Sequence, residues 1–400
     1  MNVGQQPANA GTVPVAATAT AFRANTQRTI KRPGVVLSGV LTAGAPVPLP
    51  DTQIPPTTLL RCIYIEVAAV TAANAATVVF GADAPLNVFS TVNFHDAQGT
   101  SIVGSFDSFT LAMAQKWFGF VNNSDPVESA VFTSTPGVGG GLGGSFTVVL
   151  RIPVEVVART GVGSQINTDT QSPLVLSLTL NAGTGTGGVY ATPPTTYPTV
   201  SVVISYGGYW NQSGNPNSFA TPSAVGTLNY VNWTNYTGLA GQQQFQLSNI
   251  GLGNSISNIM FINRATAGLA RSDANFANPL QVAYRGNVLG QWSQLLWKHI
   301  MSEAYGFGNP VQDSGLGVNA GAASLTTGVG LGTSLNQGLY NLWFNDDFTF
   351  DPGNTLFFSL LNSAVGDSIE LTGSWPTSST LYEIINFLAV SGPVSAIQGH

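Results

Sequence analysis

The chain has 400 residues, of which 44% are hydrophobic and only 8% are charged, and its formal net charge is −6. Normal hydrophobicity with low charge excludes an intrinsically disordered chain, which needs the opposite balance. No run of 18 apolar residues predicts a transmembrane helix, and the single cysteine, Cys62, cannot form an intrachain disulfide.

Residues 1–35 are predicted to be an extended N-terminal arm, because no apolar period is sustained there. Four of the twelve basic residues lie in this arm: Arg23, Arg28, Lys31 and Arg32. No acidic residue occurs before Asp51, so the arm is locally basic on an acidic protein. These cations can bind the phosphates of lipid headgroups or of nucleic acid, or the arm can contact a neighbouring subunit, and a merely solvated tail is the alternative. Aromatic side chains do not interleave with them as in binders of single-stranded nucleic acid, so we expect no sequence-specific nucleic acid contact.

Residues 36–212 are predicted to form a first jelly roll. Across the whole chain, 46 glycines and 23 prolines separate short apolar runs, a pattern typical of an all-β protein. In this half the runs indicate strands at 35–41, 59–70, 76–80, 88–94, 146–157, 174–180 and 200–206. Phe106, Phe109, Met113 and Trp117 recur at helical spacing and predict one amphipathic helix at 105–118. A glycine-rich loop at 136–144 follows it.

Residues 213–400 repeat this order of strand, helix, loop and strand. Strands are expected at 256–262, 280–284, 339–344 and 381–387, with a glycine-rich loop at 315–338. A second helix is expected to end at Gly306 and to bury one face, formed by Trp292, Leu295, Leu296, Ile300 and Ala304. The repeat predicts an all-β fold of two tandem eight-stranded jelly rolls, each with a flanking α-helix, which meet in the polar stretch 211–221.

One long segment carries no charge at all. Between Asp169 and Arg264 no acidic or basic residue occurs. Such a segment stays soluble through Asn, Gln, Ser, Thr and Tyr, or is covered by neighbouring subunits. A compositional habit of the source organism explains it equally well.

Groups that could catalyse a reaction or bind a metal are sparse. The three histidines, His95, His299 and His400, have no cysteine or glutamate at metal-ligand spacing, and no nucleophile elbow supports a serine triad. The one carboxylate cluster, Asp346, Asp347 and Asp351, is either a calcium site or, more simply, a solvated hairpin end. We therefore expect no enzyme activity, no catalytic or metal-binding residue and no cofactor.

The organisation resembles the double jelly-roll major capsid proteins of tectivirus-type bacteriophages, which have an internal membrane. Two segments carry the resemblance: Cys62-Ile-Tyr-Ile-Glu-Val-Ala-Ala-Val-Thr-Ala-Ala-Asn and Pro85-Leu-Asn-Val-Phe-Ser-Thr-Val-Asn-Phe-His-Asp-Ala-Gln-Gly. The second half keeps the family's order of strand, tryptophan-containing helix, loop and strand. The resemblance covers roughly residues 36–395 and is one of pattern, without a diagnostic short motif.

This resemblance implies a structural protein of the virion, assembled in the host cytoplasm. It implies a homotrimer with a pseudo-hexagonal outline that contacts neighbouring capsid trimers, penton proteins and minor capsid proteins in an icosahedral shell. That shell would enclose an internal lipid membrane, with the arm on its inner side. Loops 136–144, 183–194 and 315–338 would form towers on its outer side.

A secreted or surface carbohydrate-binding or adhesive β-sandwich is the alternative function. It needs an exposed aromatic platform, for which Trp210, Trp233 and Tyr236 are the candidates. A jelly-roll enzyme of the cupin type needs a histidine-rich metal set, which three scattered histidines do not provide.

Overall fold

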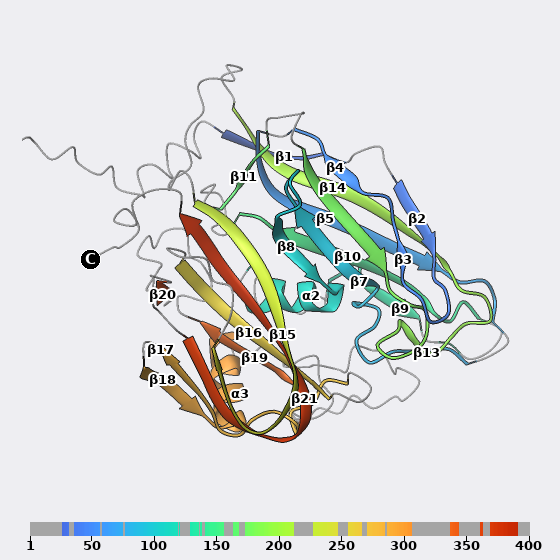
Figure 1. Ribbon diagram of the computed structural model, residues 1–400. Coiled ribbons are helices and arrows are strands. Elements are labelled where there is room, and N and C mark those ends of the chain that lie inside the picture. The colour runs from blue at the N-terminus through green and yellow to red at the C-terminus, as the bar shows by residue number, and fades with distance from the viewer. Residues whose placement is uncertain are drawn as a thin grey trace, which may run out of the picture.

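The computed structural model shows two β-rich halves that lie side by side (Figure 1). It describes residues 26–31, 36–56, 58–74, 77–118, 120, 129–135, 137, 141–155, 163–167, 173–211, 227–246, 255–265, 270–284, 286–305, 337–343, 361–362 and 369–390. The last strand described before the expected domain boundary ends at Asn211, and the first strand after it begins at Thr227.

The first half is a sandwich of two antiparallel sheets. One sheet contains β1 (Thr26–Lys31), β2 (Val36–Val40), β5 (Thr58–Val70), β9 (Thr133–Thr135), β10 (Ser145–Pro153), β11 (Gln165–Asn167) and β14 (Thr199–Asn211). Its main order is β1-β14-β5-β10-β9, and β2 also pairs with β14. The edge of this sheet therefore includes residues 26–31, which the sequence had placed in the arm.

The facing sheet contains β3 (Val47–Pro48), β4 (Thr52–Ile54), β7 (Phe89–His95), β8 (Ser101–Phe106) and β12 (Leu174–Leu180). Strand β12 shows why these residues form a sandwich, because its leucines are buried while the residues between them are only half-buried. A short pair, β6 (Val79–Phe80) and β13 (Tyr190–Thr192), lies at one end.

Helix α2 (Ser108–Trp117) lies between the two halves (Figure 1). It starts later than the sequence predicted, because β8 continues to Phe106 and Asp107 caps the helix. The Asp107 carboxylate accepts a hydrogen bond from the backbone N–H of Thr110 at 2.8 Å. All ten residues of the helix are buried, Lys116 included, so both of its sides contact protein.

The second half is built around two long strands, β15 (Thr227–Gln246) and β21 (Ile369–Val390). Strand β21 also pairs with β16 (Ser255–Ala265) and with β17 (Leu280–Tyr284). The remaining strands pair with these two: β18 (Asn287–Trp292) with β17, and both β19 (Leu339–Trp343) and β20 (Leu361–Asn362) with β16. The end of β21 pairs with β16, and its beginning pairs with β17. The two long strands form one antiparallel pair and curve together, so that this pair contributes to both sides of the sandwich (Figure 1).

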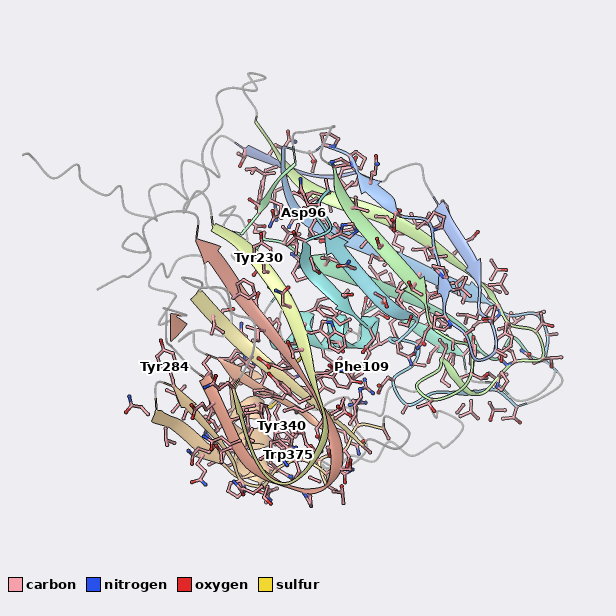
Figure 2. The ribbon with its side chains drawn as sticks, in the orientation of Figure 1. Asp96, Phe109, Tyr230, Tyr284, Tyr340 and Trp375 are labelled. Carbon is pink, nitrogen blue, oxygen red and sulfur yellow. The ribbon has the colours of Figure 1, made fainter. Side chains whose placement is uncertain are left out.

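The bend in β15 coincides with breaks in its register against β21, between Tyr236 and Leu239 and between Leu239 and Gly241. Gly238 and Gly241 both adopt a φ of 69°, which is open to glycine and strained for other residues. Tyr340 and Trp375 lie inside this half, whereas Phe109 lies near the boundary between the halves (Figure 2).

Helix α3 (Gln294–Tyr305) corrects the predicted buried face of the second helix. Trp292 belongs to β18 and not to the helix. Leu295 is 68% exposed and Leu296 is 47% exposed, whereas Trp297 and Met301 are buried. The buried face is therefore rotated from the predicted one, because Trp297 packs against Phe276 and Tyr340 of its own half. Gly306, the expected end of the helix, lies outside the described residues.

Candidate assembly interface

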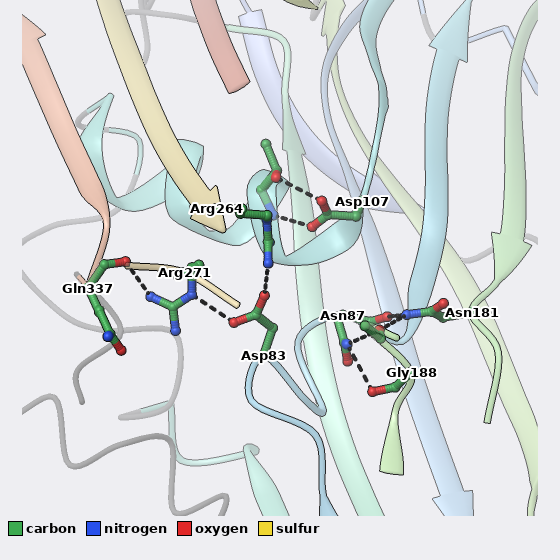
Figure 3. Close-up of polar contacts among 10 residues, drawn as sticks. Asp83, Asn87, Asp107, Asn181, Gly188, Arg264, Arg271 and Gln337 are labelled. Atoms are coloured by element: carbon green, nitrogen blue, oxygen red, sulfur yellow. Dashed lines mark hydrogen bonds and ion pairs between the residues drawn. The ribbon is translucent and has the colours of Figure 1, made fainter. Parts of the chain in front are cut away.

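A buried ion cluster joins the two halves. Arg264 Nη1 lies 2.6 Å from Asp83 Oδ2, and Arg271 Nε lies 2.7 Å from Asp83 Oδ1 (Figure 3). Asp83 lies in a turn of the first half, and the two arginines lie in the second. All three residues are at most 8% exposed. One carboxylate thus binds two guanidinium groups from the other half, a geometry that fixes how the halves meet.

The aromatic ring of Phe109 covers this cluster from the start of α2. The Arg271 guanidinium carbon lies 4.5 Å from the ring centre, and that of Arg264 lies 5.8 Å from it. Burial acts to raise the pKa of Asp83, but the charges and hydrogen bonds of Arg264 and Arg271 outweigh it and lower that pKa to about 2. Asp83 is therefore ionised across the whole physiological range.

A second joint lies at the other end of α2. The carbonyl oxygen of Trp117 accepts hydrogen bonds from Trp343 Nε1 at 2.8 Å and from Asn341 Nδ2 at 3.3 Å. A helix leaves its last carbonyls without partners inside the helix, so β19 of the second half supplies them here. The rings of Trp117 and Trp343 also pack against each other, 5.9 Å apart.

A third joint is made by backbone. Strand β8 of the first half pairs in parallel with β15 of the second through Val103 and Val231. One continuous sheet therefore runs through both halves. Together with the ion cluster and the α2 contacts, this pairing makes the two halves one unit that can pack against other molecules as a whole.

The second half exposes apolar side chains on β18 and α3. Four residues form what we call the β18–α3 surface: Val288 (56% exposed), Leu289 (42%), Leu295 (68%) and Leu296 (47%). Strand β18 is also the end of its sheet, so one edge of its backbone has no neighbouring strand among the described residues. An exposed edge that carries apolar side chains is a site for contact with another molecule.

The first half exposes a second apolar area, which we call the outer valine face. It comprises Val36 (56% exposed), Val40 (50%), Val70 (68%) and Val149 (38%). The strand registers place these four side chains on one face. Across β14, Val36 is level with Glu66 and Val40 is level with Val70. On the other side of β5, Val149 lies opposite Glu66. The face also holds serine and threonine but few charges, so covering it desolvates little.

The structure describes part of the basic arm. Arg28 is exposed on β1, where its backbone lies opposite Tyr209, and Lys31 is the last residue of that strand. Arg23 and Arg32 lie outside the described residues, so the grouping of the four cations stays a prediction. Behind β1, the buried Tyr209 hydroxyl donates a hydrogen bond to Glu155. Burial first, and then the Glu155 charge and hydrogen bond, raise the pKa of Tyr209.

His95 lies beside a serine but does not form a catalytic arrangement with it. His95 Nε2 lies 3.1 Å from Ser177 Oγ, but Asp51 accepts from that serine at 2.6 Å and does not contact the imidazole. His95 Nδ1 instead faces the carbonyl oxygen of Asp96. In a catalytic triad the carboxylate orients the histidine, and the histidine acts as the base for the serine. Here the carboxylate of Asp51 instead accepts a hydrogen bond from the serine itself.

The described residues hold no group of three side chains suited to a metal ion, and Asp346, Asp347 and Asp351 lie outside them, as does His400. Helices α2 and α3, the described ones, are too short to cross a membrane. The side chain of Trp210 lies outside the described residues, and the other two aromatic residues of the expected carbohydrate platform do not share a face. Trp233 stacks on Tyr382, and the Tyr236 hydroxyl donates to Glu383, on opposite faces of β15.

No family model and no curated protein matches the sequence. Solved structures do match, along nearly the whole chain. VP54 of PBCV-1 matches with a TM-score of 0.57 and 10% identity, over 92% of this chain and 97% of that one. The major capsid protein of the Sulfolobus Turreted Icosahedral Virus matches with a TM-score of 0.56 and 13% identity, over 91% of this chain and 97% of that one. The fold is a double jelly roll.

The double jelly roll confirms the fold class predicted from the sequence, including a helix in each half. Sequence reasoning missed the ion cluster within it, because Asp83 and Arg264 are 181 residues apart. One signal was available. Arg264 ends the long uncharged segment, and an isolated cation beside the apolar run of β16 needs a buried anion.

Proposed function

We propose that this chain is a viral major capsid protein. The observation that carries the proposal is the double jelly-roll fold, shared over more than nine-tenths of the chain with the capsid proteins named above. The extensive junction between the two halves supports the proposal, because a shell subunit must keep one conformation while it contacts several neighbouring subunits. The proposed role is structural, and it includes no cofactor and no catalytic residue.

The finer part of the proposal concerns assembly. We infer that the chain forms homotrimers with a pseudo-hexagonal outline and that these trimers tile an icosahedral virion with penton and minor capsid proteins. The β18–α3 surface and the outer valine face supply two separate contact areas on each chain. Two different surfaces on one subunit support head-to-tail contacts that close into a ring.

The arm completes the proposal. Arg23, Arg28, Lys31 and Arg32 would contact a neighbouring subunit or the headgroups of an internal membrane, as in the tectivirus-type phages that the sequence resembles. The exposure of Arg28 at the sheet edge supports this role. Sequence-specific binding of nucleic acid is not part of the proposal.

Mass photometry and negative-stain electron microscopy of the purified chain test this function. We expect a particle with the mass of three 41.5 kDa chains and a hexagonal outline. A stable monomer that binds glycans on an array would overturn the proposal in favour of an adhesive β-sandwich.

A further inference from the structure

Three buried asparagines form a row across one sheet of the second half. They are Asn229 on β15, Asn386 on β21 and Asn258 on β16, and each is at most 1% exposed. Asn386 on β21 pairs with Asn258 on one side and with Val231 of β15 on the other side. Asn229 is two residues before Val231 on β15, so it projects from the same face as Val231. Since side chains alternate along a strand and opposite residues share a face, all three amides project from the same face of this sheet.

That face is the one that meets the first jelly roll. The same alternation on β16 places Arg264, which binds Asp83, on the face of Asn258. Trp343 lies opposite Asn258 on β19, and its indole donates to the carbonyl oxygen of Trp117 in α2. On β15, Val231 pairs with Val103 of the first half. The asparagine row therefore lies at the junction of the two jelly rolls, between these contacts.

The amides of the row lack protein partners. Five of their six polar atoms are buried without a hydrogen bond: Asn229 Oδ1 and Nδ2, Asn386 Oδ1 and Nδ2, and Asn258 Oδ1. The sixth, Asn258 Nδ2, donates to Ser257 Oγ at 3.1 Å. The buried Asn74 of the first half is the contrast, because its Nδ2 donates to Gly143 O at 2.8 Å and its Oδ1 accepts from Thr195 N at 2.9 Å.

Buried amides without partners are rare because each loses its hydrogen bonds to water. The identity of the missing partner follows from the atoms that need one. A cation would satisfy only the oxygens, and an anion would satisfy only the N–H groups. Water donates and accepts, is neutral, and forms about three hydrogen bonds when buried in proteins. The neighbours Val231, Met260 and Trp343 carry no charge that would favour an ion.

We propose that the asparagine row binds a cluster of ordered water molecules at the junction of the two jelly rolls. This inference does not depend on the capsid function, because it rests only on buried residues within a single chain. The bound water completes the hydrogen bonds of the row and makes the junction between the halves partly hydrated.

A high-resolution crystal or cryo-electron microscopy map of the full chain tests the proposal. We expect ordered solvent density within hydrogen-bonding distance of the Asn229, Asn386 and Asn258 amides. We also expect this density to be lost in the double variant Asn258→Leu/Asn386→Leu. A map in which the three amides face each other or apolar atoms, with no solvent between them, would overturn the proposal. So would a single peak surrounded only by oxygen atoms, which would indicate a cation.

Thermal unfolding gives an independent measurement. Asn386→Leu should lower the unfolding midpoint by several degrees, because the bridging water loses a partner that leucine cannot replace. Asn74→Leu is the matched control and should lower the midpoint in any case, since its amide is fully bonded to protein. A midpoint raised by Asn386→Leu would contradict the proposal, because only a dry, unpartnered amide is improved by an apolar replacement.

Discussion

Asp83 is the residue on which the junction of the two jelly rolls depends most directly. It is the one carboxylate that binds both Arg264 and Arg271. Removing Asp83 takes away the carboxylate that both buried guanidinium groups bind, and breaking a buried ion cluster in this way costs more than the cluster contributed when it was intact.

Replacing Asp83 with asparagine should therefore destabilise the chain by about 3–5 kcal/mol in urea unfolding. Glu303→Gln is the matched control, because Glu303 is exposed on α3 and its substitution should change the free energy of unfolding by less than about 0.5 kcal/mol. Equal effects of the two substitutions would show that the cluster does not hold the halves together.

The same residue predicts a dependence on pH. The pKa of Asp83 is lowered from 3.8 to about 2 in the folded chain, so its contribution is complete above pH 3.8 and is lost as the pH falls through 2. The difference in unfolding free energy between the wild type and Asp83→Asn should shrink by about 2 kcal/mol between pH 5 and pH 2. A difference that stays constant over this range would contradict the assigned pairing.

At the scale of elements, helices α2 and α3 have different roles. Helix α2 is buried on all sides and receives partners from both halves, so it is part of the junction. Helix α3 packs on its own half through Trp297 and Met301 and leaves Leu295 and Leu296 exposed. The first helix thus stabilises the subunit, whereas the second offers a surface.

The cross-half bond at the end of α2 can be tested by Trp343→Phe. This change keeps an aromatic ring but removes the indole N–H that donates to Trp117, and should cost about 0.5–1.5 kcal/mol of unfolding free energy. Trp233→Phe is the control, because Trp233 is half-buried like Trp343 and contacts Tyr382 through its ring, a contact that phenylalanine can keep, so this substitution should cost less. The reverse order of the two effects in urea unfolding would refute this assignment.

The β18–α3 surface can be tested by Leu295→Glu. Because Leu295 is 68% exposed, the subunit should fold normally, but a buried charge in a subunit contact should shift trimers to monomers in light scattering. Leu142→Glu, at a residue that is 55% exposed in the loop at 136–144, should leave the trimer intact. A Leu295→Glu trimer as stable as the wild type would exclude this surface from the contact.

For the whole molecule, the arm is the segment with the strongest local charge. The variant with Arg23, Arg28, Lys31 and Arg32 all changed to glutamine should keep its trimer but lose binding to anionic lipid vesicles in a sedimentation assay. Each cation near such a surface contributes about 1 kcal/mol. Vesicles of neutral lipid are the control. Substitution is preferable to deletion of residues 1–33, because residues 26–31 form β1 of the first jelly roll. Unchanged vesicle binding would mean that the arm contacts protein instead.

The sequence by itself determined the fold class. Turn residues between alternating apolar runs depend only on local chemistry, so strands such as β12 and β17 and the existence of both helices could be predicted. The twenty residues of β15 escaped prediction, because this strand contains many polar residues and no sustained apolar run. Its backbone is held by β21, more than a hundred residues away in the chain.

Only the tertiary structure decided which side chains are buried at the junction. Local pattern assigned Leu295 and Leu296 to a core and singled out neither Asn386 nor Asn258, whereas the folded chain exposes the leucines and buries the asparagines. The pairing of Asp83 with two arginines likewise depends on how the two jelly rolls meet. Burial is a property of neighbours in space, and at this junction those neighbours come from the other half of the chain.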